Sequence, residues 1–292
     1  MKYLKVLILF FSFSILFQLT TTFANAGPCT ITNGEYSESE IKNGVGGTDC
    51  GTVPAKYEII VNEAYLCTSA ATIPTTTVAA DLSMCTKVFE NTTGAVASVA
   101  QNEDINMEGK SFRPPFGTYT HSYAKIDKKV AVTWSGKIDG VMQSSTSNNN
   151  DTGQFCGTKA GSGTFENGAT HTNSIICGTS AITPGKFIET MNSFSDSAVE
   201  TTSPLIDNVP GNPGATIQGI ITDTNGFAST GNSDSFRLEA AMKSSVPIVI
   251  DEGTRNLNVK FSLTDASHLS EEDGNDRLMI SSGPFISIMT AE

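Results

Sequence analysis

The stretch TYTHSYAKIDKKVAVTW, residues 118–134, decides the fold class. Its second half places Val130, Val132 and Trp134 on one face and more polar or smaller residues on the other. This alternation with a period of two is typical of a half-buried antiparallel strand. The tyrosine-rich first half alternates in the same way, and residues 127–128 lie between the halves. We therefore expect either a β-hairpin or one long bent ribbon here.

Similar β patterns cover most of the remaining chain, with turn residues between them. No apolar period of 3.6 residues is sustained, and only 196–201 and 266–273 are candidate helices. The other expected strands are 57–67, 84–89, 216–222, 235–242, 247–250, 257–263, 277–280 and 284–289, and the expected turns are 91–94, 225–226, 251–253 and 273–274.

Short strands at intervals of roughly 8–15 residues favour a sandwich or a barrel. We predict an all-β protein: an antiparallel β-sandwich, Ig-like or prealbumin-like, with long disulfide-stapled loops. The expected organisation is a stapled N-terminal segment at 27–56 and a sandwich domain at 57–292, with polar excursions at 140–178 and 192–214. Two sub-domains dividing near residue 140 or 190 are the alternative.

The first 26 residues have the pattern of a secretory signal peptide. Lys2 and Lys5 precede an apolar run from Leu7 to Phe17, and Ala24-Asn25-Ala26 supplies an A-x-A cleavage site. The run is shorter than the ~20 residues that a membrane-spanning helix needs. We expect cleavage after Ala26, no stable membrane span in the product, and a secreted or periplasmic location.

Six cysteines follow this segment, and an even number in an exported chain favours disulfides. Fifteen connectivities are possible, and the clustering favours nearest neighbours. No C-x2-C pair suggests zinc, and a catalytic thiol would leave an odd cysteine. The expected pairs are Cys29–Cys50, Cys67–Cys85 and Cys156–Cys177.

Composition excludes some functions. The chain has 18 Lys+Arg against 30 Asp+Glu, a net charge of −12. A nucleic-acid partner is therefore not expected, because such binding needs a basic face.

Several segments together resemble a group of uncharacterised exported β-rich proteins of marine bacteria. The similar segments are YEIIVNEAYLC, MCTKVFE, PPFGTYTHSYAKIDKKVAVTWSG, FCGT, LNVKFSLTD and GPFISI. The positions that match the pattern of the group are Cys67, Cys85, Pro115, Gly117, Thr118, Tyr119, Thr120 and His121. The Pro-x-Gly-x-Tyr entry also resembles prealbumin-like and Ig-like sandwiches. The resemblance implies a β-rich fold and carries no catalytic residues.

No motif for nucleophilic catalysis or phosphate binding occurs, so no catalytic or cofactor-binding residue is expected. Only His121, His171 and His268 could act as bases in a triad assembled in space. A carboxylate pair for glycoside hydrolysis is a further alternative, with candidates beside strands at Glu58, Glu63, Asp127 and Asp139. We expect the only tryptophan, Trp134, to lie in the core.

Calcium is the one metal that the sequence suggests, because clustered carboxylate and amide oxygens are its preferred ligands. Neither of the two acidic turns has EF-hand spacing, and solvated turns are the simpler interpretation. The weak candidates are Glu271, Glu272, Asp273 and Asp276 in one turn and Asp223 and Asn225 in the other.

These observations favour a non-enzymatic exported sandwich with a structural, adhesive or binding role. A carbohydrate- or Ca2+-binding module, using acidic loops and exposed tyrosines, is the alternative; a secreted hydrolase is less favoured. The expected partner is a second copy of the chain, bound through strand edges, or a glycan or protein ligand.

Overall fold

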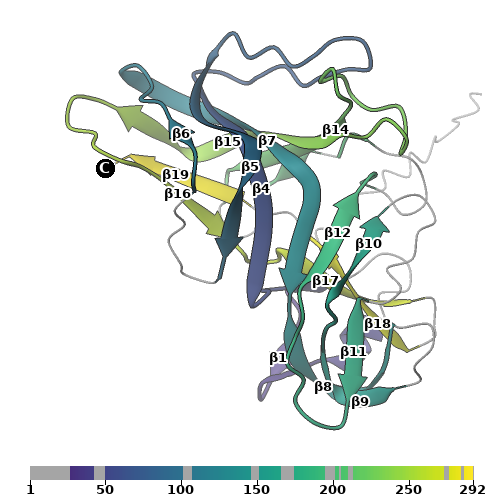
Figure 1. Cartoon of the computed structure of the whole chain (residues 1–292). Helices are drawn as coiled ribbons and strands as arrows, with labels where there is room; N and C mark the ends of the chain where they lie inside the picture. Colours follow the sequence, from purple (N-terminus) through teal and green to yellow (C-terminus); the bar gives the residue numbers. More distant parts are fainter. Residues whose placement is uncertain are drawn as a thin grey trace, which may run out of the picture.

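The structure is a computed structural model that describes residues 27–42, 50–100, 107–145, 151–165, 174–194, 201–203, 205–209, 213–272, 276–283 and 286–291 (Figure 1). The predicted signal peptide lies outside these residues. In the described part, the only helix is α1 (Glu38–Lys42). The strands are β1 (Ile31–Thr32), β2 (Glu35–Tyr36), β3 (Cys50–Thr52), β4 (Lys56–Cys67), β5 (Cys85–Val99), β6 (Lys110–Ser111), β7 (Gly117–Thr133), β8 (Ser135–Ser144), β9 (Thr152–Thr158), β10 (Gly161–Phe165), β11 (Ile175–Gly178), β12 (Phe187–Met191), β13 (Ile206–Asp207), β14 (Thr216–Thr222), β15 (Arg237–Ile250), β16 (Leu257–Ser262), β17 (Ser267–Glu272), β18 (Arg277–Ser282) and β19 (Ile286–Ala291).

The strands form two large layers, which confirms the predicted all-β sandwich. The large sheet has the order β13-β14-β15-β7-β4-β5-β6, with β12 also pairing with β7 and β10 with β12. The small sheet has the order β1-β2-β8-β18-β17-β3, with β9 also pairing with β8 and β11 with β9. Most pairs are antiparallel, but β10–β12, β18–β8 and β2–β8 are parallel.

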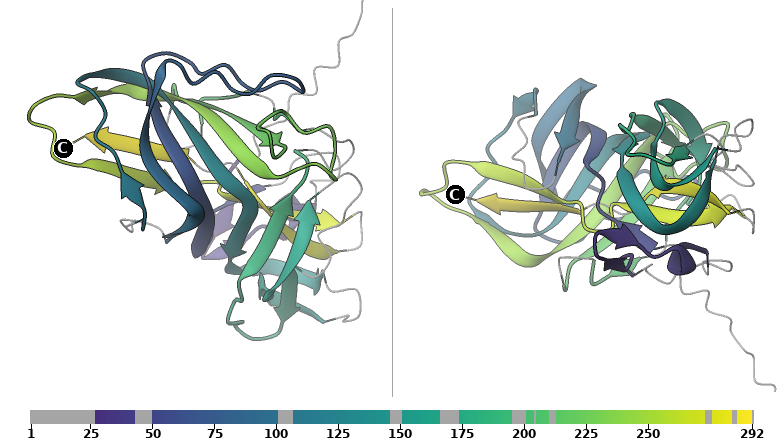
Figure 2. Two further views of the ribbon diagram at one scale, coloured as in Figure 1. Left: turned by 45° about the horizontal axis from the view of Figure 1, so that its top comes forward. Right: turned by 90° about the horizontal axis from the view of Figure 1, so that it is seen from below.

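A separate two-stranded ribbon, β16–β19, carries the C-terminal end of the described chain. Figures 1 and 2 show this end on the opposite side of the molecule from β9 and β11. The sandwich is therefore elongated, with the ribbon near one end and the small sheet near the other.

The stretch that predicts the fold class is also the connection between the sheets. Residues 118–133 lie in the single long strand β7, so the ribbon alternative is correct and the hairpin is not. After Trp134 the chain enters β8 of the small sheet. The indole is buried, as expected, and its Nε1 donates a hydrogen bond to Thr52 Oγ1 at 3.2 Å. Trp134 thus stabilises the corner between the layers.

One continuous apolar cluster lies between the two sheets. Its members come from both layers, including Ile59 and Val132 of the large sheet and Ile138, Leu269 and Ile280 of the small sheet. A core of this kind forms when the inner faces of two sheets are packed together.

The turn predicted at residues 91–94 is wrong, because β5 continues through it. On β4, Val61 pairs with Ala95 and Glu63 with Glu90, so Asn62 alone lies opposite residues 91–94. Gly94 has φ +85°, a conformation that favours glycine. The turn-forming residues therefore make a bulge within one strand rather than a turn between two.

The helix predicted at 266–273 is also wrong. Residues 267–272 form β17, which pairs with β3 and β18. Ser267 and Leu269 are buried while His268 and Ser270 are half-buried, so the burial has the period of a strand. Tertiary pairing outweighs a weak helical pattern here. The other candidate helix, 196–201, lies almost wholly outside the described residues.

The polar excursion at 140–178 contains much regular structure. It includes the end of β8 and all of β9, β10 and β11. Serine, threonine and glycine therefore do not prevent pairing once neighbouring strands supply hydrogen bonds.

Candidate functional site

Three disulfides are present, and their connectivity is the predicted one. Cys29 bonds to Cys50, Cys67 to Cys85, and Cys156 to Cys177. The last two pairs lie directly opposite each other on neighbouring strands, β4–β5 and β9–β11. Three disulfides are typical of an oxidising, extracellular compartment. Within the described ranges, no helix is long and apolar enough to cross a bilayer.

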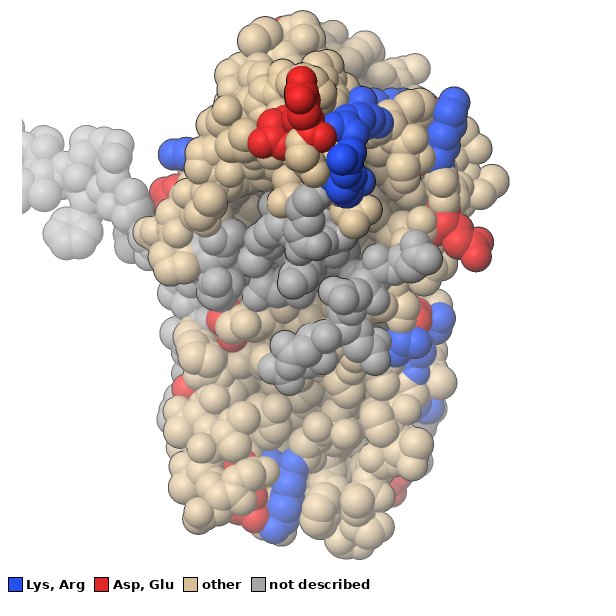
Figure 3. Space-filling model, turned by 90° about the vertical axis from the view of Figure 1, so that its left-hand side faces the viewer, with Lys and Arg blue, Asp and Glu red and all other residues tan. Residues whose placement is uncertain are grey.

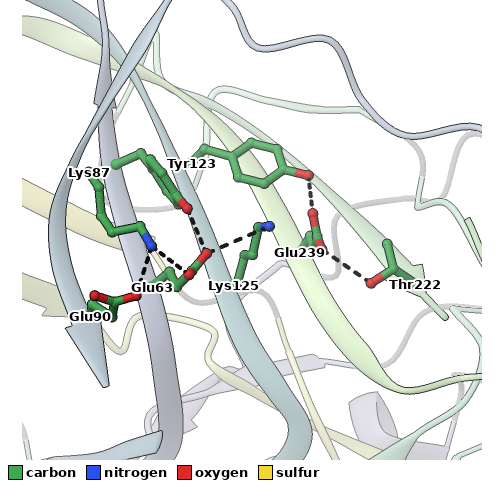
Figure 4. Close-up of polar contacts among 8 residues, drawn as sticks. Glu63, Lys87, Glu90, Tyr123, Lys125, Thr222 and Glu239 are labelled. Atoms are coloured by element: carbon green, nitrogen blue, oxygen red, sulfur yellow. Dashed lines mark hydrogen bonds and ion pairs between the residues drawn. The ribbon is translucent and has the colours of Figure 1, made fainter. Parts of the chain in front are cut away.

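A row of charged and polar side chains lies across the large sheet, and we call it the polar ladder (Figure 4). It begins on β5 and passes over β4, β7 and β15 to β14. Glu63 lies near its centre, with Lys87 Nζ 2.7 Å from one carboxylate oxygen and Lys125 Nζ 3.6 Å from the other. Its members are Glu63, Tyr65, Lys87, Glu90, Tyr123, Lys125, Thr222 and Glu239.

These neighbours keep Glu63 ionised to a lower pH than an ordinary carboxyl. Burial alone would raise the pKa of its carboxyl, but hydrogen bonds from Lys87 and Tyr65 and the charge of Lys125 hold that pKa below its usual range. Hydrogen bonding to Glu63 in turn raises the pKa of Lys87. A general acid needs the opposite arrangement, a carboxyl with a raised pKa. The contacts of Glu63 therefore suit holding strands together better than transferring protons.

The other end of the ladder contains a buried carboxylate, Glu239 on β15. Tyr123 donates its phenolic hydrogen bond to one oxygen at 2.6 Å, and Thr222 donates to the other at 3.3 Å. Burial raises the pKa of Tyr123, and the nearby charge of Glu239 raises it further, so the phenol keeps its proton as a donor. Lys125 lies opposite Glu239 on the neighbouring strand β7.

The four carboxylates considered for hydrolysis lie in separate networks. Glu58 accepts contacts from Lys56 and Lys186 at 3.1 and 3.0 Å, and these hold its pKa below the usual range despite burial. Glu63 belongs to the polar ladder. Asp127 accepts the backbone N–H of Lys129, and Asp139 that of Glu38.

In the calcium candidate that contains Asp223 and Asn225, Asp223 Oδ1 accepts the backbone N–H groups of Asn225 and Phe227 at 2.8 and 2.9 Å. The hydrogen bond from Phe227 contributes most to lowering the pKa of Asp223. This is an Asx-type turn, in which the carboxylate stabilises its own loop.

The calcium candidate that contains Glu271 and Asp276 is connected to α1. Glu271 accepts the N–H of Asp276 at 2.7 Å, and the Asp276 carboxylate lies 2.7 Å from Lys42 Nζ. Lys42 also pairs with Glu38. Asp273 and the side chain of Glu272 lie outside the described residues. In the part that the structure covers, no three His, Cys, Asp or Glu side chains are grouped closely enough to hold a metal ion.

The two described histidines lie on different strands of different sheets. His121 is half-buried in β7 and makes a 2.8 Å hydrogen bond with Thr120 Oγ1. His268 is the second residue of β17, and burial lowers its pKa. His171 lies outside the described residues.

The exposed tyrosines expected of a carbohydrate site are not found among the described residues. Tyr36 is half-buried, and the other four described tyrosines, Tyr57, Tyr65, Tyr119 and Tyr123, are buried. Tyr57 and Tyr119 belong to the main core, and Ala71, Ala80 and Leu82 pack against the buried cluster that contains Tyr65 and Tyr123.

The sequence did not indicate an exposed apolar group at one end of the large sheet, which we call the apolar end. Phe116, Val246 and Val249 are 60%, 74% and 53% exposed. Val249 pairs with Thr118, and Phe116 directly precedes β7. The Arg113 guanidinium lies 5.5 Å from the centre of the Phe116 ring.

A register shift in β15 explains why this group was missed. On β7, His121 pairs with Lys243 and Tyr119 with Ile248, so residues 244–247 form a bulge that contains Val246. The run VPIVI predicts a strand but does not show which face is exposed. Alternation alone could have suggested that Val249 points away from buried Ile248 and Ile250.

No family model matches this chain, and no curated protein or solved structure matches it either.

Proposed function

We propose that this protein is an exported, non-enzymatic β-sandwich with a structural, adhesive or binding role in the cell envelope or outside the cell. The apolar end is the observation that carries this proposal. Three large apolar side chains, from β15 and from the residue before β7, are exposed there, whereas Lys87 and Lys125 of the polar ladder pair with Glu63. Grouped apolar side chains on a surface are typical of interaction sites.

Export is supported by the disulfides together with the predicted signal peptide. Intact-mass analysis of the full chain, expressed in a bacterium and recovered from the periplasm or medium, tests it. We expect a product cleaved after Ala26 with three disulfides. A cytoplasmic product that keeps residues 1–26 would contradict this part of the proposal.

The adhesive role is tested with octyl-coated beads as an apolar probe and hydroxyl-coated beads as the reference. We expect the wild type to be retained on the octyl surface and the double variant Val246→Ser, Val249→Ser to be retained several-fold less. Val141→Ser is the matched control, because Val141 is 52% exposed but lies on β8 in the small sheet. Equal retention of the double variant and the wild type would show that the apolar end is not the adhesive surface.

A further inference from the structure

The second half of β5 has an uncovered side. Residues 95–99 pair with β4 on one side. On the other side of β5, β6 pairs only with Phe89 and Glu90, and no described strand pairs with 95–99. We call residues 95–99 the open edge. Its outward backbone N–H and C=O groups can accept another strand.

The side chains of the open edge suit such pairing. The sequence is Ala-Val-Ala-Ser-Val, without charge or proline. Ala95, Ala97 and Val99 are buried against the core, whereas Val96 points outward and is 58% exposed. Natural sheets usually protect an edge with lysine, proline, a bulge or a short strand. Here the bulge at 91–94 lies at one end only, and five residues of regular strand follow it.

The charged groups beside the open edge are one carboxylate, Glu58, and the two lysines that pair with it. Val96 lies opposite Ile60 on β4, and Ser98 lies opposite Glu58. The Glu58 carboxylate is engaged by Lys56, Lys186 and the Ser98 hydroxyl, the last at 3.4 Å. In Figure 3, which shows the left-hand side of Figure 1, the charged side chains of the described residues lie in a few separate places, and uncharged described residues cover much of the lower part. Within residues 95–99 themselves there is no charged side chain, so pairing along the edge relies on backbone groups and small uncharged side chains.

We propose that the open edge pairs in antiparallel register with the open edge of a second copy of this chain. A two-fold axis at Ala97 places each Val96 opposite Ser98 of the other copy, so the interface is self-complementary. The pairing satisfies outward backbone groups on both chains and covers both Val96 side chains. It joins two large sheets into one continuous sheet. This inference stands on the edge alone and does not depend on the apolar end.

Sedimentation velocity of the full, processed chain over a wide concentration range tests the proposal. We expect a monomer–dimer equilibrium for the wild type and a monomer at every concentration for Val96→Lys, which places a charge on the edge. Val141→Lys makes the same substitution at a similarly exposed valine in the small sheet, and it should dimerise like the wild type. A thermal melt of each variant checks that the monomer is folded.

A mixing experiment tests the register. Because position 96 lies opposite position 98 of the other copy, Val96→Lys mixed with Ser98→Glu should recover a heterodimer that Val96→Lys alone does not form. A wild type that stays monomeric, a Val96→Lys variant that dimerises normally, or a dimer that only Val141→Lys disrupts would each overturn the proposal. Retention on octyl beads should be unchanged in Val96→Lys, so this proposal and the adhesive role can fail separately.

Discussion

The two halves of β5 lie in one strand and against one neighbour, β4, yet their surroundings differ. The first half is bonded to β4 by the Cys67–Cys85 disulfide, pairs with β6 at Phe89 and Glu90, and supplies Lys87 to the polar ladder. The second half, residues 95–99, has β4 on one side and no described strand on the other. The bulge at 91–94 separates them. Stability and association can therefore be assigned to different parts of a single strand, the first half to stability and the second to association.

The largest expected effect is at Glu239, at the end of the polar ladder farthest from the first half of β5. Glu239→Ala leaves the Tyr123 and Thr222 hydroxyls without their acceptor and creates a void in a buried site. We expect a loss of about 3 to 4 kcal/mol in the free energy of unfolding. Urea denaturation measures it, with Glu239→Gln as the control that keeps the shape and should lose less. A loss below about 1 kcal/mol in Glu239→Ala would contradict a structural role for this carboxylate.

The next effect concerns the Cys67–Cys85 disulfide in the first half of β5. The double variant Cys67→Ser, Cys85→Ser opens a loop with a sequence separation of 18. The chain-entropy model gives a destabilisation of about 3 kcal/mol for a loop of this size. Thermal unfolding should show a lower melting temperature, while the dimer equilibrium per folded molecule stays unchanged. A selective loss of dimer in the folded variant would mean that the two halves are not independent.

A smaller, pH-dependent effect is expected at Glu63. We expect Glu63→Gln to cost about 1 kcal/mol at pH 7, because the ladder is partly exposed to solvent. The pKa of this carboxyl is lowered in the folded protein from an ordinary value of 4.5, so its contribution is present above that value and is lost as the pH falls through the lowered pKa. The difference between variant and wild type should thus shrink towards zero in acid. Denaturation curves at several pH values measure it; a difference that persists in strong acid would contradict the ionic role.

In the open edge, Val96→Lys should change the free energy of unfolding of the monomer by less than about 0.5 kcal/mol, since the side chain is exposed. Urea denaturation at low protein concentration, where the wild type is also monomeric, compares the two monomers directly. A large loss there would mean that Val96 supports the fold rather than an interface.

The smallest expected effect is that of calcium. The Asp223 carboxylate accepts two N–H groups of its own loop, and Asp276 pairs with Lys42. We therefore expect the melting temperature to be nearly the same in Ca2+ and in a chelator. A clear rise in Ca2+ would instead support the alternative proposal of a Ca2+-binding module.

The sequence predicted what depends on local pattern. The alternation at Val130, Val132 and Trp134 indicated strands, and the clustering of the cysteines indicated all three disulfides. It did not predict what depends on register. Glu63, Lys87 and Glu239 are far apart in the chain, and only the pairing of β5, β4, β7 and β15, with its bulges, brings them into one row. The open edge likewise depends on how far β6 extends along β5.

Hydrogen exchange along β5 tests the central claim most directly, because it reads both halves in one molecule. Amides of residues 85–90 that bond to β4 or β6 should be protected equally in dilute and concentrated protein. Amides of residues 95–99 that point away from β4 should exchange quickly in dilute protein and become protected as the concentration rises. Rapid exchange at 95–99 that does not change with concentration would contradict pairing of the open edge with a second copy.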